Sequence, residues 1–243
     1  NGTYRYKLDN SNLTSGATET TSTSYTPGSG ISEASHTLFV QERDATGNWS
    51  SSGSRTIVID TTTPSVDNFT LSDTALKAGE TATVTLVFSE AVASFSSSAD
   101  ITVANGTLAV MTSTDNITWA GTFTPTANTE DDNNTLSLAT SYTDTAGNTG
   151  PAATTLNYVV DTTAPTVTSV STTADNQSLV SITDNITVTF SEAMEPSYVT
   201  TNTSDTYCSG SIQVSSTNFS SGSGSCVRMS SEPISSNSNM TFT

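Results

Sequence analysis

The sequence predicts an all-β protein, built from β-sandwiches of about seven antiparallel strands that follow one another in tandem. Short runs of apolar residues alternate with polar neighbours, as Val84, Leu86 and Phe88 do, and a period of two is typical of strands buried on one face. No stretch of useful length shows the helical period of 3.6 residues. Three motifs also recur after about a hundred residues, the size of a small sandwich domain.

The recurring motifs divide the chain into three parts. An Asp-Thr-Thr-x-Pro linker begins at Asp60 and Asp161, an Asp-x-x-Gly-Asn turn at Asp44 and Asp144, and a Phe-Ser-Glu-Ala loop at Phe88 and Phe190. The second copies follow the first by 101, 100 and 102 positions, so all three motifs share one period. We expect residues 1–60 to end one repeat, 61–161 to form a complete repeat and 162–243 to begin a third. Incomplete terminal repeats indicate a segment of a longer protein.

The strands are expected in chain order from the same alternation. The run from Thr81 to Phe88 has the strongest strand pattern, Asn105-Gly106 is a hairpin signal, and residues 76–80 and 129–134 read as a turn and an acidic loop. The expected strands are 4–8, 37–42 and 55–59 in the first part, 66–71, 81–88, 101–103, 108–112, 117–123, 136–142 and 156–160 in the second, and 186–190 in the third.

Composition and net charge indicate which kinds of partner the protein can bind. Apolar residues make up 33% of the chain and charged residues 12%, and both fractions are lower than in most soluble globular proteins. The net charge of −17 disfavours binding to nucleic acid or anionic lipid and favours divalent cations. No apolar run has the length of a membrane span, about 18 residues.

The second part resembles the bacterial Ig-like repeats of giant surface adhesins. The segments that carry the resemblance are 76–84, 88–92, 104–108, 122–125, 144–148 and 160–165. Residues 1–60 resemble the end of a related Ig-like or fibronectin-like repeat, and residues 188–196 are similar to Ig-like modules of S-layer and other envelope proteins. The resemblance implies immunoglobulin-like sandwiches in a secreted or cell-surface stalk or adhesin, often stiffened by calcium, and no catalytic activity.

Strand order places the repeated acids at one end of the second repeat. If seven strands alternate in direction, the loop after the second strand and the loop between the last two both return to the end where the repeat begins. Glu90 lies in the first loop and Asp144 in the second, while the linker brings Asp60 to the same end. Oxygen ligands from loops suit Ca²⁺, and three carboxylates without a cation repel each other. We therefore expect Asp60, Glu90, Asp144 and Asn148 to bind calcium.

The same motifs supply further candidate ligands. Asp161 and Glu192 are the counterparts at the second junction, and Asp44 and Asn48 form the equivalent turn of the first part. The alternative is that the Asp and Asn residues only shape turns and that the Glu residues are solvated loop charges. The sequence leaves both interpretations open.

The two cysteines, Cys208 and Cys226, have 17 residues between them. A local disulfide is favoured over two free thiols, and a metal site is disfavoured because no His or third Cys is near. A disulfide indicates a location outside the cytoplasm.

Other residues that carry chemistry have simpler explanations. His36 shares the strand parity of Leu38 and Val40, which favours a half-buried structural histidine over a catalytic base. Trp119 alternates with core residues, whereas Trp49 follows a polar turn and is a candidate for stacking on a sugar.

The sequence therefore predicts a non-enzymatic stalk whose partners are neighbouring repeats of the same protein. One alternative is a subunit of an extracellular filament or sheath, in which copies complete one another. Another is an accessory carbohydrate-binding module that contacts a host or surface glycan.

Overall fold

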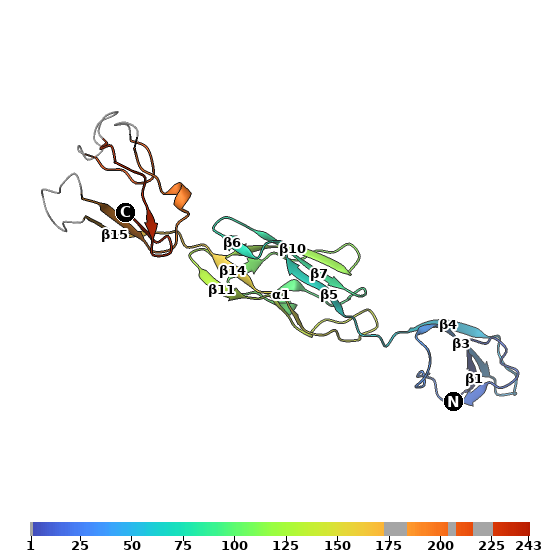
Figure 1. Ribbon diagram of the computed structural model, residues 1–243. Coiled ribbons are helices and arrows are strands. Elements are labelled where there is room, and N and C mark those ends of the chain that lie inside the picture. Colours follow the sequence, from blue (N-terminus) through green and yellow to red (C-terminus); the bar gives the residue numbers. More distant parts are fainter. Residues whose placement is uncertain (1, 173–183, 204–207, 216–225) are drawn as a thin grey trace. The chain divides into compact units, whose positions relative to one another are not determined.

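Most strands are antiparallel in the computed structural model, which describes residues 2–172, 184–203, 208–215 and 226–243. The chain divides into two compact units, Asn1–Thr162 and Thr163–Thr243, and Figure 1 shows both as almost entirely β. The all-β, immunoglobulin-like prediction is confirmed. No helix among the described residues is long and apolar enough to cross a membrane.

The first part of the chain forms one antiparallel sheet. Its strands are β1 (Thr3–Leu8), β2 (Thr18–Thr20), β3 (Ala34–Arg43) and β4 (Gly53–Ile59), in the order β2-β1-β3-β4. The three strands expected here are confirmed, and β2 is an addition within a stretch that reads as loop. Tyr6 packs edge-on against Tyr25, with 5.1 Å between ring centroids, and Leu13 is buried, so the loops before and after β2 both contribute apolar contacts to this part.

The second repeat is the most complete sandwich. Its elements are β5 (Val66–Leu71), β6 (Ala75–Lys77), β7 (Ala82–Phe88), α1 (Ser97–Asp100), β8 (Ile101–Thr102), β9 (Gly106–Leu108), β10 (Thr118–Pro125), β11 (Glu130–Asn134), β12 (Ser137–Leu138), β13 (Ala153–Thr154) and β14 (Tyr158–Asp161). They form three sheets, β5-β7-β10-β9, β11-β14-β6 and β13-β12-β8. The alternate residues of β7 are buried, and Phe88, Phe123, Tyr142 and Tyr158 fill the core.

The expectation of about seven antiparallel strands is wrong in detail. Residues 61–162 contain ten strands, because several are broken into short pieces, and β6 pairs with β14 in parallel. The turn expected at 76–80 begins inside β6 because Leu76 is buried in the core and only the following residues, with Gly79 at φ +82°, reverse the chain.

Two further expectations fail in the second repeat. The acidic loop at 129–134 contains β11, which pairs with β14. There the side chain of Asn134 donates to the carbonyl of Tyr158 at 3.1 Å, so a polar residue replaces an apolar one in holding the strand. Asn105 adopts the left-handed conformation expected of a turn, yet it joins two sheets instead of a hairpin, since β8 pairs with β12 and β9 with β10.

The second unit contains a four-stranded antiparallel sheet. Its elements are β15 (Val167–Thr172), β16 (Ile186–Phe190), the 3-10 helix η1 (Pro196–Tyr198), β17 (Ser235–Ser236) and β18 (Thr241–Phe242), and the strand order is β15-β16-β18-β17. Phe190 and Phe242 pack edge to face at 5.9 Å. Cys208 and Cys226 are joined in a disulfide, so these cysteines are not free thiols in the structure.

Candidate metal centre

The linker after β4 contributes the first carboxylate. Asp60 directly follows this strand, and one of its carboxylate oxygens accepts a hydrogen bond from the backbone amide of Thr62 at 3.1 Å. Its own carbonyl accepts from the Nδ2 of Asn148 at 3.2 Å. The linker is therefore tied to the turn at the end of the second repeat through Asn148.

The Asp144 turn is held by hydrogen bonds of its own. Asp144 is only 2% exposed, and its Oδ1 accepts from the amides of Gly147 and Asn148 at 2.7 and 2.9 Å. Its Oδ2 accepts from Asn148 Nδ2 at 2.8 Å. Gly147 has φ +101°, a conformation that glycine adopts without steric cost. This sequence therefore presents a buried carboxylate at the tip of a closed turn.

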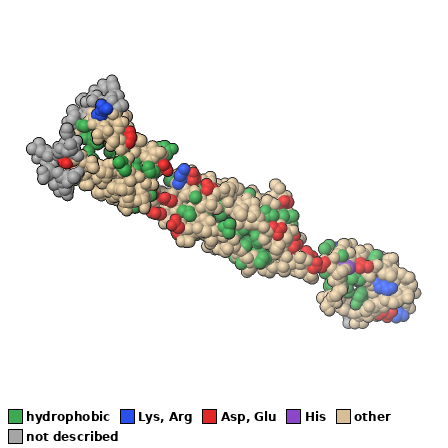
Figure 2. Space-filling model, in the orientation of Figure 1, with side chains coloured by type: hydrophobic (Ala, Val, Ile, Leu, Met, Phe, Trp, Pro, Cys, Tyr) green, Lys and Arg blue, Asp and Glu red, His purple; other side chains and the backbone are tan. Residues whose placement is uncertain are grey.

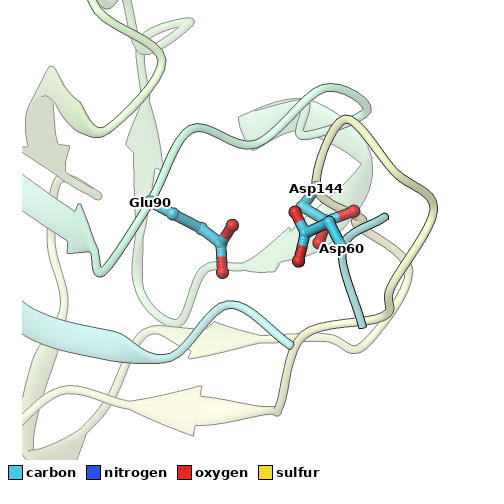
Figure 3. A group of neighbouring side chains, drawn as sticks. All are labelled: Asp60, Glu90 and Asp144. Carbon is cyan, nitrogen blue, oxygen red and sulfur yellow. The ribbon is translucent and has the colours of Figure 1, made fainter. Parts of the chain in front are cut away.

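Glu90 reaches the same place from the loop after β7. Val92 forms a β-bridge with Asp144, and the amide of Ala93 donates to the carbonyl of Thr143 at 2.8 Å. These backbone contacts fix the loop beside the turn, and Figure 3 shows the side chain of Glu90 directed toward Asp60 and Asp144.

The three acids form one cluster. Carboxylate oxygens of Asp60, Glu90 and Asp144 lie within 4.8 Å of one another, with Asp144 buried and the other two partly buried. Among the described residues, the ion pairs within 4 Å are His36 with Asp9 and Lys77 with Glu80, so no basic side chain compensates the cluster. Acidic side chains also prevail over basic ones on the surface in Figure 2.

The pKa values of Glu90 and Asp144 are shifted in opposite directions, for different reasons. Burial raises the pKa of Glu90, and the negative charges of Asp60, Asp144 and Glu33 raise it further. Burial also disfavours the charged form of Asp144, but hydrogen bonds from Asn148 and the turn amides outweigh it and lower the pKa of Asp144. The charged form of Asp144 is therefore stabilised, whereas the neighbouring negative charges destabilise the charged form of Glu90.

The donor set fits a hard cation. All three groups are carboxylates, the ligands that Ca²⁺ accepts in flexible, oxygen-rich geometry, whereas structural Zn²⁺ sites are built from Cys and His. Asn148 directs its amide nitrogen at Asp60 and Asp144, which makes it a residue that positions both acids.

The other candidate ligands lie elsewhere. Asp44 and Asn48 form the same closed turn, with 2.7 Å between Asn48 N and Asp44 Oδ1. Hydrogen bonds from Asn48 and Thr46 lower the pKa of Asp44 to about 2, and Asp44 belongs to no group of three potential metal ligands among the described residues. Asp161 ends β14 in the first unit, and Glu192 follows β16 in the second.

Residues singled out for other chemistry have structural contacts. The guanidinium of Arg5 lies 4.3 Å from the centre of the Trp49 ring and that of Arg43 lies 5.7 Å away, as in a cation–π stack. His36 is buried against Asp9, and Trp119 packs on the core beside Phe95.

Glu33 is the acid near the cluster that sequence reasoning missed. Its carboxylate accepts hydrogen bonds from Thr61 and Thr62 in the linker. It belongs to no recurring motif, and the contact depends on how the loop before β3 folds, so only tertiary structure reveals it.

Comparison with known proteins identifies the family. Residues 60–160 and 161–243 each match a family model described as a bacterial Ig-like domain, and no curated protein matches the sequence. Among solved structures, the D00-D0 domain of Intimin aligns at 16% identity with a TM-score of 0.24, over 63% of this chain and 78% of that one.

A second solved structure is of a protein from Bacteroides ovatus. This protein, SGBP-B of a mixed-linkage glucan utilization locus in complex with a heptasaccharide, aligns at 14% identity with a TM-score of 0.21, over 69% of this chain and 41% of that one. Both TM-scores are too low to bear on function. The two family matches together span residues 60–243, and the chain belongs to the bacterial Ig-like domain family.

Proposed function

We propose that the chain is part of the shaft of a bacterial surface protein, and that Asp60, Glu90 and Asp144 bind a calcium ion that stiffens the connection between its first two repeats. The observation that carries this proposal is the uncompensated cluster of three carboxylates from the linker and two loops. Membership in the bacterial Ig-like domain family and the disulfide support an extracellular location, where calcium is abundant.

The mechanical role follows from the origin of each ligand. Asp60 comes from the linker that ends the first repeat, whereas Glu90 and Asp144 come from loops of the second. A cation bound to all three ties the linker to the second repeat and removes its rotational freedom. Without the cation, repulsion between the carboxylates opposes this arrangement, and hydrogen bonds such as that from Asn148 Nδ2 to the carbonyl of Asp60 must hold the linker beside the loops.

A scattering experiment tests this proposal. Small-angle scattering of the whole chain in calcium and in EDTA measures the distribution of distances between repeats. We expect a narrower distribution and a larger maximum dimension in calcium, and no change in Asp144→Asn. The matched control is Asp44→Asn, which alters the equivalent turn of the first repeat, where the described residues contain no cluster of three acids. Identical scattering of the wild type with and without calcium would refute the proposal.

An open strand edge favours a second candidate function, assembly into a filament. β15 is the edge strand of its sheet, and no described strand pairs with its outer edge. Val167 and Val170 on this strand are 55% and 64% exposed. An exposed edge strand offers unpaired amides and carbonyls with which a strand of another copy can pair. Light scattering and electron microscopy, with Val170→Lys as the variant that blocks pairing, test whether the chain polymerises.

The glycan-binding alternative has less support. The guanidinium of Arg5 packs over the Trp49 ring and so covers an aromatic face on which a sugar would stack. Trp49 therefore serves first to hold β1 against the turn that follows β3.

A further inference from the structure

Glu33 lies next to the proposed calcium site, in the loop before β3, and contacts the linker with both carboxylate oxygens. Oε1 accepts from the amide of Thr61 at 3.1 Å and also from its hydroxyl, while Oε2 accepts from the hydroxyl of Thr62 at 2.7 Å. These are the two residues that follow Asp60. Hydrogen bonds to a charged acceptor are the stronger kind, so one side chain restrains the backbone at the point where Asp60 leaves β4.

The backbone beside Glu33 is itself anchored to the sheet. His36 lies on β3 and is buried. One of its ring nitrogens contacts the carbonyl of Ser32 at 2.9 Å, and the other contacts the carboxylate of Asp9, after β1, at 2.6 Å. A chain of hydrogen bonds therefore runs from the end of β1 through His36 and the 32–33 segment to the linker.

Glu33 adds a negative charge near the cluster, and hydrogen bonds from Thr61 and Thr62 to its carboxylate lower its own pKa. Its charge acts on Glu90 together with those of Asp60 and Asp144, although it lies outside the group of three acids whose oxygens fall within 4.8 Å. A fourth negative charge close to the cluster adds repulsion in the absence of a cation. Its hydrogen bonds to the linker donors offset this repulsion.

We propose that Glu33 is a positioning residue: it latches the linker through Thr61 and Thr62 and so holds Asp60 toward Glu90 and Asp144 before any cation binds. The latch itself is independent of calcium, whereas its purpose in preparing the site rests on the proposed function. If the linker samples other conformations once the latch is lost, the apparent calcium affinity falls in proportion to the fraction of chains that remain ready to bind.

The first test measures the latch without metal. In EDTA, we expect the amide of Thr61 to exchange with solvent about 10-fold more slowly in the wild type than in Glu33→Ala, because an amide donor is protected while it is bonded. The matched control is Glu19→Ala, which removes the same charge from an exposed position on β2. Equal exchange of Thr61 in wild type and Glu33→Ala would overturn the proposal, whether or not calcium binds.

The second test measures calcium affinity by titration calorimetry of the whole chain. We expect Glu33→Ala to weaken binding about 10-fold, and Thr62→Val, which keeps every charge and removes one donor, to weaken it by a smaller factor. Thr63→Val and Glu19→Ala serve as controls and should bind like the wild type. Weaker binding in Glu33→Ala with unchanged binding in Thr62→Val would reduce the role of Glu33 to its charge and refute positioning. Failure of the wild type to bind calcium would instead refute the proposed function.

Discussion

Substitution of Asp144 by Asn provides the sharpest test of the carboxylate cluster. The change removes one charge from a group whose oxygens lie within 4.8 Å of each other. Two carboxylates at 4.8 Å repel by about 3 kcal/mol at an effective dielectric of 20, and by less than about 1 kcal/mol in water. Because Asp60 and Glu90 are partly buried, the repulsion lies between these limits. The calcium-free variant should therefore lose part of this repulsion, partly offset by weaker hydrogen bonding in the turn.

Calcium should also stabilise the wild type. Binding to the folded state at a hundredfold excess over Kd stabilises a protein by about 2.7 kcal/mol. For a domain of about a hundred residues, this corresponds to a rise in Tm of roughly 10–20 °C. The rise should be absent in Asp144→Asn, because a single substitution removes a ligand and a third of the charge of the cluster.

Calorimetric melting in calcium and in EDTA measures both effects. Asp44→Asn is the matched control, since Asp44 accepts the same bond from its turn Asn, at 2.7 Å, but belongs to no described acid cluster. It should retain the full response to calcium. An equal rise in Tm for the wild type and Asp144→Asn would show that calcium acts elsewhere, and no rise in the wild type would mean that these acids only shape turns.

Three further predictions concern charge and the disulfide. The raised pKa of Glu90 means that its charge destabilises the calcium-free fold, so Glu90→Gln should raise stability to urea in EDTA at pH 7 and abolish the calcium response. Hydrogen bonding to Asp9 raises the pKa of His36, so its contribution is complete below the unfolded value of about 6.5 and is lost as pH rises through the folded value. The fall in Tm over this range should disappear in His36→Gln. Reduction of the bond between Cys208 and Cys226, which are 18 positions apart, should destabilise the second unit by about 3 kcal/mol in urea unfolding, and a Tm unchanged by reductant would contradict this.

Strand pattern predicted the fold well where one face of a strand is buried. Residues 66–71 form β5 at the expected positions, and β7 begins one residue later than expected, because the alternation there reflects a true division between core and solvent. The pattern failed at β11, whose residues Glu130–Asn134 are all polar. There backbone pairing with β14 and the buried amide of Asn134 define the strand, and alternation of hydrophobicity carries no such signal.

The candidate site was predictable in part because it is made of repeated motifs. The period of the Asp60 linker, the Glu90 loop and the Asp144 turn, combined with strand direction, was sufficient to bring the three acids together, although the repeat contains more strands than expected. The equivalence of Asp44 with Asp144 extends to the hydrogen bonds inside the two turns, whereas a cluster of three acids is found among the described residues only at Asp144.

The sequence by itself determined the all-β class, the period of the repeat and the identity of the three clustered acids, because each is encoded in local alternation or in motifs that recur. Tertiary structure alone decided which turn meets a cluster, that β6 joins β14 in parallel, and that Glu33 holds the linker. These features depend on contacts between segments far apart in the chain, and such contacts leave no periodic trace in the sequence.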